Sequence, residues 1–317
     1  MSETRMSVEQ AAEICSRIAD NVERVIIGKR EAVERCLVAM IARGHVLLED
    51  VPGVGKTMLA RSIAASLGGD FRRIQFTPDL LPTDVTGVSI YDQKRGEFSF
   101  RPGPIFANIV LADEINRASP RTQSSLLEAM EERQVTVDGV THALPLPFMV
   151  IATENPIEYE GVYPLPESQL DRFLLRFSLG YPERAEEKMI VREQLKGHPV
   201  ETLVPVAGAS EITAVQEVAS RCHVSEEVYD YVLDLVTGTR ESGDLSLGAG
   251  PRGSLAVVRC AQAVATIDGR DFIGPDDIKL IAQEALAHRV IPRPEARVSG
   301  VTGAEVVGDL LESIPVP

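Results

Sequence analysis

The sequence lacks tryptophan and has few aromatic residues of any kind. Phe, Tyr and Trp together make up 5% of the 317 residues, and Trp is absent. Proteins that bind single-stranded nucleic acids commonly stack the bases on aromatic side chains. The scarcity of aromatics therefore disfavours that class of partner, and it predicts a core built from aliphatic side chains.

Positive charge is also scarce. The chain has 32 Lys and Arg against 47 Asp and Glu, a formal net charge of −15. This excess of negative charge repels nucleic-acid backbones and anionic membrane surfaces. The basic clusters, Arg72-Arg73 and Lys94-Arg95, are short. The charge therefore disfavours broad binding to nucleic acid or to an anionic membrane, and we expect no nucleic-acid partner.

Cysteines are few and widely spaced. Cys15, Cys36, Cys222 and Cys260 form no C-x-x-C pair, and the five histidines show no spacing typical of metal ligands. This pattern predicts reduced thiols on apolar helix faces. The N-terminus has no signal-peptide-like apolar segment, and no apolar run reaches the length needed to span a membrane. Together these features predict a cytoplasmic protein.

The most informative stretch that is present runs from His45 to Leu67. Val46–Leu48 is a short apolar run typical of a buried strand, and the glycine-containing turn after it cannot continue that strand. From Lys56 onward, apolar residues recur on one helical face until Gly68-Gly69. A strand, a glycine loop and a helix in this order form a site for phosphate, because the glycines and the helix N-terminus present backbone N–H groups to the anion.

The side chains of this loop favour a nucleoside triphosphate. Lys56 can reach the β- and γ-phosphates, and the Thr57 hydroxyl can bind Mg²⁺. One departure is Asp50, which stands where the usual phosphate-loop pattern has its first glycine. The alternative is a helix cap that happens to contain Gly-Lys-Thr, but the flanking strand and helix favour the phosphate loop. The candidate nucleotide-binding residues here are Pro52, Gly53, Val54, Gly55, Lys56, Thr57 and Met58.

A second apolar run, Ile109–Ala112, predicts a strand buried on both faces, and Asp113 and Glu114 follow it. Ligands bind at the carboxyl ends of strands in open α/β sheets. Asp113 can therefore hold Mg²⁺ through water, and Glu114 can polarise the attacking water. The alternative is a surface pair that simply ends a strand.

A third apolar run, Phe148–Thr153, ends in Glu154-Asn155-Pro156. If this strand neighbours the one before Asp113, the Asn155 amide can orient a water and sense the γ-phosphate. The alternative for Asn155 is a turn residue placed before proline.

The remaining elements complete a five-stranded parallel α/β domain over residues 1–181. A capping box at Ser7 predicts a helix that ends at Gly28. The other expected elements are a helix at Glu31–Ile41, strands at Arg73–Thr77 and Phe173–Leu179, a helix at Thr122–Glu132, and hairpins at Val88–Phe100 and Val135–Leu144.

Residues 182–317 are predicted to form an all-α second domain. Its expected helices are Arg184–Leu195, Glu211–Cys222 capped by Ser210, Glu226–Thr237 capped by Ser225, Pro251–Ile267 and Pro275–His288. Arg252 lies in the first turn of its helix, where a cation opposes the macrodipole. This placement indicates an anionic ligand, or alternatively an exposed arginine whose stem covers apolar surface.

The motifs in combination resemble the AAA+ ATPases, and within them the MoxR family. The likeness covers nearly the whole chain from about Ile14. The sequences that carry it are LLEDVPGVGKT, LADEINRAS, ATENPIEYEGVYPLPESQLDRF and GPRG. AAA+ phosphate loops often depart from the first glycine, so Asp50 is compatible with the resemblance.

The resemblance implies roles that spacing alone does not. Asn155 matches sensor 1, Arg252 matches sensor 2 reaching from the lid to the γ-phosphate, and Arg172 occupies the place of the trans-acting arginine finger. Arg176 is the alternative finger. Ile27-Gly28 is similar to the segment that contacts adenine. The resemblance further implies that both hairpins face the axis of a homo-oligomeric ring, which we expect to be a hexamer.

The implied function is Mg²⁺-dependent hydrolysis of ATP to ADP, used to remodel, mature or activate partner protein complexes, often with proteins bearing a von Willebrand A domain. One alternative is a nucleic-acid-dependent AAA+ motor, which the net charge of −15 disfavours. Another is a nucleotide-gated scaffold with little turnover. The presence of Glu114, Asn155 and Arg172 disfavours that scaffold.

Overall fold

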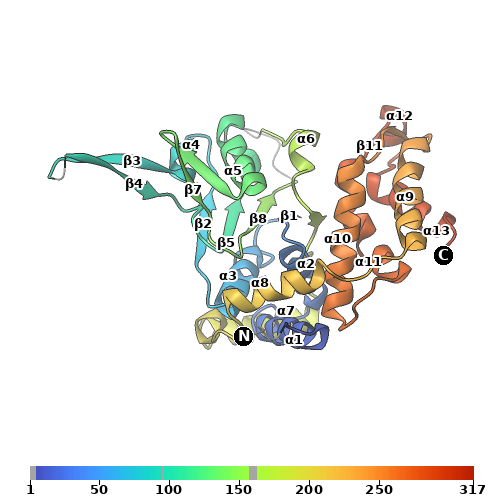
Figure 1. Cartoon of the computed structure of the whole chain (residues 1–317), viewed down its shortest axis with the longest axis horizontal. Helices are drawn as coiled ribbons and strands as arrows, with labels where there is room; N and C mark the ends of the chain where they lie inside the picture. The colour runs from blue at the N-terminus through green and yellow to red at the C-terminus, as the bar shows by residue number, and fades with distance from the viewer. Residues whose placement is uncertain (1–4, 95, 157–162) are drawn as a thin grey trace.

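The computed structural model describes residues 5–94, 96–156 and 163–317. An α/β part carries the N-terminal half of the chain, and a helical part lies beside it (Figure 1). Arg95 in the predicted turn and residues 157–162 of the third motif lie outside the described residues.

The α/β part is built on a five-stranded sheet with the order β2-β5-β8-β1-β9. Every pair of neighbours in it is parallel. Its strands are β1 (Val46–Glu49), β2 (Phe71–Gln75), β5 (Ile109–Asp113), β8 (Met149–Glu154) and β9 (Leu175–Phe177). This arrangement confirms the predicted parallel sheet.

Alternate residues of the central strands pack into two separate hydrophobic cores, one on each face of the sheet. In β1, Val46 and Leu48 join the core on one face, and Leu47 joins the core on the other. Side chains alternate between the faces of a strand, so a fully apolar strand is stable only if both faces are covered. The short apolar runs in the sequence follow from this.

Helices cover both faces. The first core contains residues of α1 (Val8–Glu23), α2 (Arg30–Ile41) and α3 (Lys56–Ser66). The second contains residues of α4 (Pro82–Thr86) and α5 (Pro120–Glu132). A short helix, α6 (Glu167–Leu170), precedes β9. The result is the three-layer αβα core expected from the sequence.

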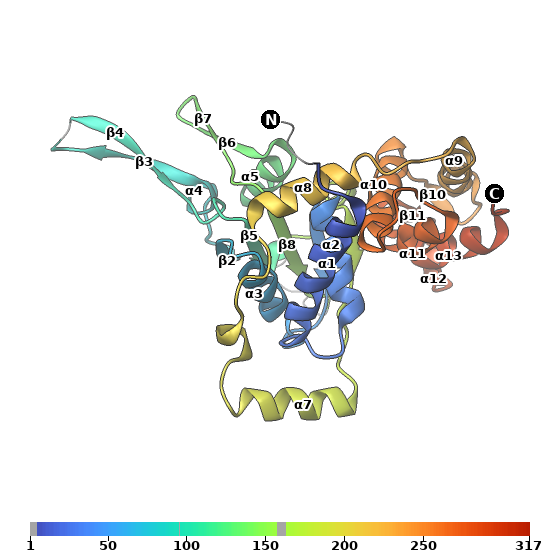
Figure 2. The ribbon, with the colours of Figure 1, turned by 60° about the horizontal axis from the view of Figure 1, so that its bottom comes forward.

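Two antiparallel hairpins extend from this core. They are β3 (Gly87–Asp92) with β4 (Glu97–Pro102), and β6 (Gln134–Val137) with β7 (Val140–Ala143). The β3–β4 hairpin projects far from the rest of the molecule (Figures 1 and 2). Both hairpins confirm the sequence prediction.

The helical part packs around α10 (Pro251–Ile267), which contacts α1 and α2 of the α/β part as well as its own neighbours. The other elements are α7 (Arg184–Gln194), α8 (Ala209–Ala219), α9 (Glu226–Glu241), α11 (Pro275–Leu286), α12 (Pro294–Val298), α13 (Gly303–Ser313), and the short strands β10 (Leu245–Leu247) and β11 (Ile291–Pro292). The α7 helix has no buried residue, and it lies away from the sheet and from α9, α11 and α13 (Figure 2).

Several predicted boundaries were wrong. The first helix ends at Glu23 rather than Gly28. Strand β2 starts at Phe71 rather than Arg73, because its ladder begins where Phe71 pairs with Ile109. Helix α8 is capped at Gly208 rather than Ser210, since the Glu211 carboxylate reaches back to accept the Gly208 N–H at 2.8 Å.

All four cysteines are free and buried. Among the described residues, no helix is both long and apolar enough to cross a membrane.

Candidate functional site

The phosphate loop joins β1 to α3, as the sequence predicted. Gly53 and Gly55 have φ values of +91° and +102°, a region that other residues enter only with strain. A Cβ added at either position would meet no heavy atom within 4 Å, so the positive φ rather than lack of space favours glycine at both positions. Thr57 and Met58 lie in the first turn of α3, beyond Pro52 and Val54 of the loop.

Lys56 lies against this loop and near two acidic residues. Its Nζ donates to the carbonyl oxygens of Asp50 at 2.7 Å and Val51 at 3.2 Å. Partial burial lowers the pKa of its ammonium, and the charges of Asp50, Asp113 and Glu114 oppose that shift. The loop lysine and the acidic pair after β5 therefore share one electrostatic environment.

Asp50 has a role that its position in the motif does not suggest. Its buried Oδ2 accepts the backbone N–H of Leu179 at 2.5 Å and that of Gly180 at 3.2 Å. The carboxylate thus ties the start of the phosphate loop to the segment after β9. A glycine at this position would leave both N–H groups without that acceptor.

Asp113 ends β5 and is held on both sides. The Thr153 hydroxyl donates to its Oδ1 at 2.7 Å, and Arg73 Nε donates to its Oδ2 at 3.0 Å. The same Thr153 oxygen accepts the backbone N–H of Glu114 at 2.9 Å. One β8 hydroxyl therefore fixes both acidic residues.

Glu114 is also oriented by its neighbours. It has a φ of +56°, which turns the chain sharply after β5. Its Oε2 accepts from Gln75 Nε2 at 2.8 Å and from Arg117 Nη1 at 2.9 Å. Sequence reasoning missed Gln75 and Thr153. The signal for both is their position at or near the carboxyl ends of strands that flank β5.

Asn155 follows β8 directly and is buried. Because β8 lies between β5 and β1, Asn155 emerges between the acidic pair and the phosphate loop. The condition set from the sequence, that the two strands be neighbours, is met. The γ-phosphate role of Asn155 stays a prediction.

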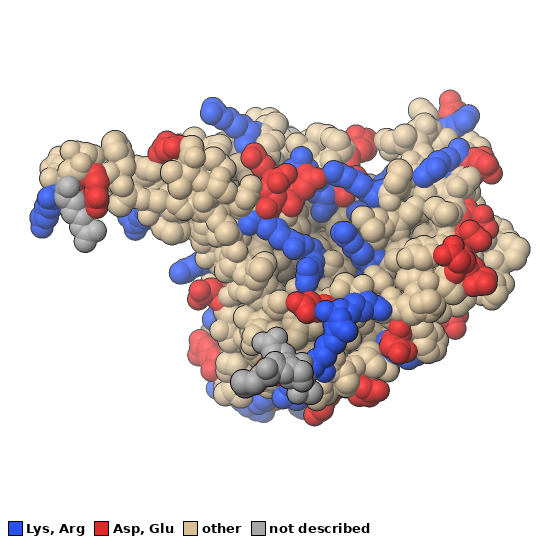
Figure 3. Space-filling model, viewed as in Figure 1, with Lys and Arg blue, Asp and Glu red and all other residues tan. Residues whose placement is uncertain are grey.

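Arg172 and Arg252 lie together on a different part of the surface. Glu131 Oε1 is 2.7 Å from Arg252 Nη2, and Glu131 Oε2 is 3.4 Å from Arg172 Nη1. Asp171 is a second partner of Arg252, at 3.5 Å. Basic and acidic side chains gather where the core meets the helical part (Figure 3). The sequence resemblance implied that Arg252 reaches a γ-phosphate, but its charged partners in the structure are core carboxylates.

Arg176, the alternative finger, has a different environment. It lies on β9, and its Nε donates to Glu49 Oε2 at 3.0 Å. Burial raises the pKa of the neighbouring Glu154 carboxyl to about 7, and the Arg176 charge opposes that rise. Arg176 thus interacts electrostatically with Glu49 at the end of β1 and with Glu154 at the end of β8.

Gly28 lies in the turn between α1 and α2, with a φ of +73°. A Cβ at this position would lie 1.9 Å from the Glu186 Oε1 of α7. The adjacent Lys29 Nζ donates to the Tyr181 carbonyl at 2.8 Å. The Ile27-Gly28 segment is therefore in contact with the chain that leaves the sheet, and its adenine contact stays a prediction.

The donor set near the loop suits Mg²⁺. Thr57 supplies a hydroxyl and Asp113 a carboxylate, and Mg²⁺ usually takes one or two protein oxygens and keeps several waters. Within the described part of the chain there is no group of three or more His, Cys, Asp or Glu arranged to hold a metal alone. The residues fit a cation that arrives with phosphate oxygens as ligands.

Comparison with known proteins agrees with this geometry. Residues 45–175 match the ATPase family associated with various cellular activities (AAA), and residues 237–310 match the AAA lid domain. A crystal structure of a Cytophaga hutchinsonii protein superimposes with a TM-score of 0.92 at 34% identity, covering 98% of this chain and 97% of that one.

Curated relatives extend over almost the full chain. The uncharacterized protein YeaC of Bacillus subtilis is 50% identical over 96% of this chain and 95% of its own. Chaperone MoxR1 of Mycobacterium tuberculosis is 41% identical over 97% of this chain and 84% of its own. Protein MoxR of Methylorubrum extorquens is 30% identical over 95% of both. The chain belongs to the MoxR family of AAA+ ATPases.

Proposed function

We propose that this protein hydrolyses ATP to ADP in an Mg²⁺-dependent reaction, as a homo-oligomeric ring that remodels partner protein complexes. The single observation that carries the proposal is the convergence of Lys56, Asp113 and Glu114 at one edge of the sheet. Phosphoryl transfer needs a cation on the phosphates, a carboxylate for the metal and an oriented water.

Each residue has a distinct part in this proposal. Lys56 and the N–H groups of the loop bind the β- and γ-phosphates, with Thr57 and Asp113 beside Mg²⁺. Mg²⁺ held by these residues would neutralise charge that develops on the transferred phosphoryl group. Glu114, held by Gln75, accepts hydrogen bonding from the attacking water, and Asn155 positions that water.

We further propose that Arg172 and Arg252 act together on the nucleotide of a neighbouring subunit. Both side chains bind Glu131, so one subunit presents them side by side. An arginine supplied in trans stabilises transition-state charge and makes turnover depend on assembly. We expect a hexamer, with residues 1–181 as the ATPase core and 182–317 as the lid.

The client is a protein in this proposal, with a von Willebrand A domain protein as one candidate. The exposed tip of the β3–β4 hairpin carries Tyr91 and Phe98, whose ring centroids are 5.2 Å apart and which are 52% and 73% exposed. Exposed aromatics are common contacts in protein interfaces. The buried, free cysteines are compatible with a reducing cytoplasm.

The experiment is steady-state ATP turnover combined with nucleotide binding. Lys56→Ala is expected to lose ATP binding, because its ammonium is the cation on the phosphates. Glu114→Gln is expected to retain ATP without hydrolysing it. Undiminished turnover by Glu114→Gln would overturn the assignment of the water-activating residue.

A further inference from the structure

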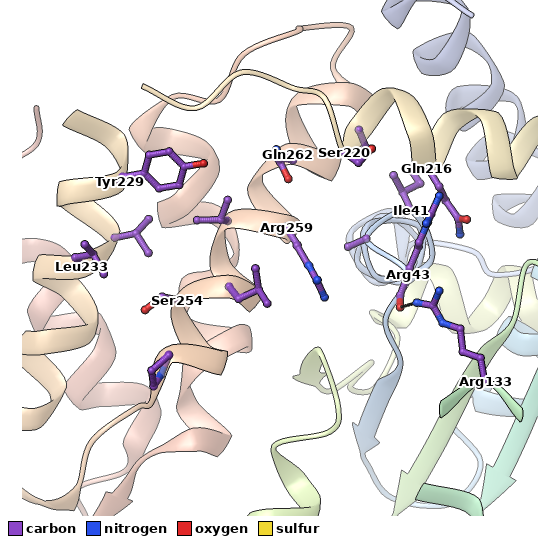
Figure 4. A pocket seen from close by; sticks show the side chains of 16 residues that line it. Ile41, Arg43, Arg133, Gln216, Ser220, Tyr229, Leu233, Ser254, Arg259 and Gln262 are labelled. Carbon is purple, nitrogen blue, oxygen red and sulfur yellow. Dashed lines mark hydrogen bonds between the residues drawn. The ribbon is translucent and has the colours of Figure 1, made fainter. Parts of the chain in front are cut away.

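A cavity separate from the phosphate loop lies between the core and the helical part. Its volume is about 630 Å³, within the range of ligand pockets. The walls come from α8 and the ends of α2 and α5 on one side, and from α9 and α10 on the other (Figure 4). None of the lining residues belongs to the nucleotide site described above.

Three arginines meet in this cavity. Arg259 extends from α10 toward Arg43, and Arg133 Nη2 donates to the Arg43 carbonyl oxygen at 2.9 Å (Figure 4). Across the residues that the structure describes, no carboxylate lies within 4 Å of any of the three guanidinium groups. Burial lowers the pKa of the Arg133 guanidinium, and the positive charges of Arg43 and Arg259 lower it further.

The backbone places two of these arginines just beyond helix ends. Arg43 and Arg133 follow the ends of α2 and α5, with φ values of +57° and +52°. A left-handed residue commonly ends a helix, so these conformations set the points at which the two side chains leave the helix ends. Helix C-terminal carbonyls offset part of the positive charge here. Arg259 lies mid-helix on α10 and receives no such compensation.

We propose that this cavity binds a small ligand with two or more linked phosphates. Guanidinium groups match phosphate oxygens in a bidentate manner, and three of them supply the charge that such a ligand carries. The ligand would bridge α10 to the ends of α2 and α5, and so couple the helical part to the core. Two sources share this chemistry, a nucleoside diphosphate and an inorganic oligophosphate.

The cavity walls offer a way to separate these sources. Tyr229 and Leu233 of α9 line the side opposite the arginines (Figure 4). An aromatic ring and an apolar side chain there would contact a base but not a free phosphate chain. A nucleoside diphosphate is therefore expected to bind more tightly than pyrophosphate, and Tyr229→Ala should remove only that difference.

The test is calorimetric titration of pyrophosphate and ADP into the full chain carrying Lys56→Ala, which weakens the phosphate loop. We expect one saturable site per chain, weakened about tenfold or more by adding Arg259→Gln or Arg43→Gln. The control is Arg221→Gln, an exposed arginine of the α8–α9 connection that pairs with Glu217 and is expected to bind as before.

Arg259→Gln and Arg43→Gln change exposed side chains, so the fold should be preserved. Circular dichroism checks this. The proposal is overturned if neither ligand binds saturably, or if Arg259→Gln and Arg43→Gln bind as the control does. Tighter binding of hexaglutamate than of pyrophosphate would also overturn it, in favour of an acidic protein segment. Because no hydrolysis is measured, these outcomes are independent of the ATPase proposal.

Discussion

Arg172 and Arg252 bind opposite oxygens of one carboxylate, that of Glu131. Arg172 follows α6 in the core, whereas Arg252 lies in the first turn of α10 in the helical part. The two arginines therefore hold a fixed relation only while the helical part is docked on the core. Movement of α10 relative to the core would separate Arg252 from Arg172 and Glu131, which gives a physical route for coupling assembly to turnover.

A mixing experiment tests whether these arginines serve a neighbouring subunit. Arg172→Ala and Glu114→Gln should each be inactive alone. A mixed ring should recover turnover where an Arg172→Ala subunit receives its arginine from a Glu114→Gln neighbour. Arg252→Ala should behave in the same way. Arg121→Ala, an exposed arginine of α5, should keep its own turnover. Mixtures that stay inactive would place the arginines in their own subunit.

Gln75 is expected to be a positioning residue for Glu114. Its side-chain oxygen accepts from Arg73 at 2.7 Å, and its side-chain nitrogen donates to Glu114 at 2.8 Å. Because Arg73 also donates to Asp113, Gln75 links Glu114 to Asp113 through Arg73. Gln75→Ala should lower kcat about 10- to 100-fold with little change in ATP affinity, since general-base catalysis depends on orientation. Gln75→Asn should recover part of the loss. An equal loss by Ala and Asn, with weaker ATP binding, would indicate a structural role instead.

Asp50 is expected to stabilise the fold as well as the loop. Asp50→Ala removes the acceptor of the buried Leu179 N–H, at a cost of about 1–3 kcal/mol in the free energy of unfolding, whereas the Gly180 N–H keeps the Ser178 hydroxyl as an acceptor. Chemical denaturation of the variant measures this. Asp309→Ala, an exposed position on α13, is the matched control and should stay within about 0.5 kcal/mol of the parent. A loss no larger than that of the control would contradict the proposed tether.

Glu154 predicts a pH dependence of stability. Burial raises the pKa of its carboxyl from 4.5 to about 7 in the folded chain. Between these values the folded state binds more protons than the unfolded state, so this group's contribution to stability falls as pH rises toward 7. Glu154→Gln should remove that contribution. Between pH 5 and pH 8, the free energy of unfolding of the variant should therefore rise by about 2 kcal/mol relative to that of the parent. Parallel pH profiles for the two proteins would show that the carboxyl titrates normally.

Local signals in the sequence were enough to predict the elements, while contacts between distant residues were not. Asp138-Gly139 specified a two-residue hairpin turn, and Ser225 specified the start of α9. In contrast, the start of β2 is set by pairing with Ile109, which no local pattern encodes.

The same distinction holds at the candidate site. The order of strands explains why Asp113, Asn155 and the loop could be predicted to meet, because ligands gather at the carboxyl ends of parallel strands. The tether of Asp50 to Leu179 and the shared contact of Arg172 and Arg252 join segments that are far apart in the chain. Sequence spacing carries no record of such partners, so only the fold identifies them.

In the proposed mechanism, turnover requires an assembled ring with arginines supplied between subunits. The most direct measurement is ATP turnover per subunit over a range of protein concentrations, with mass determined in parallel with and without ATP. Specific activity is expected to rise together with the transition from monomer to ring. Constant turnover from a protein that stays monomeric at every concentration would contradict it.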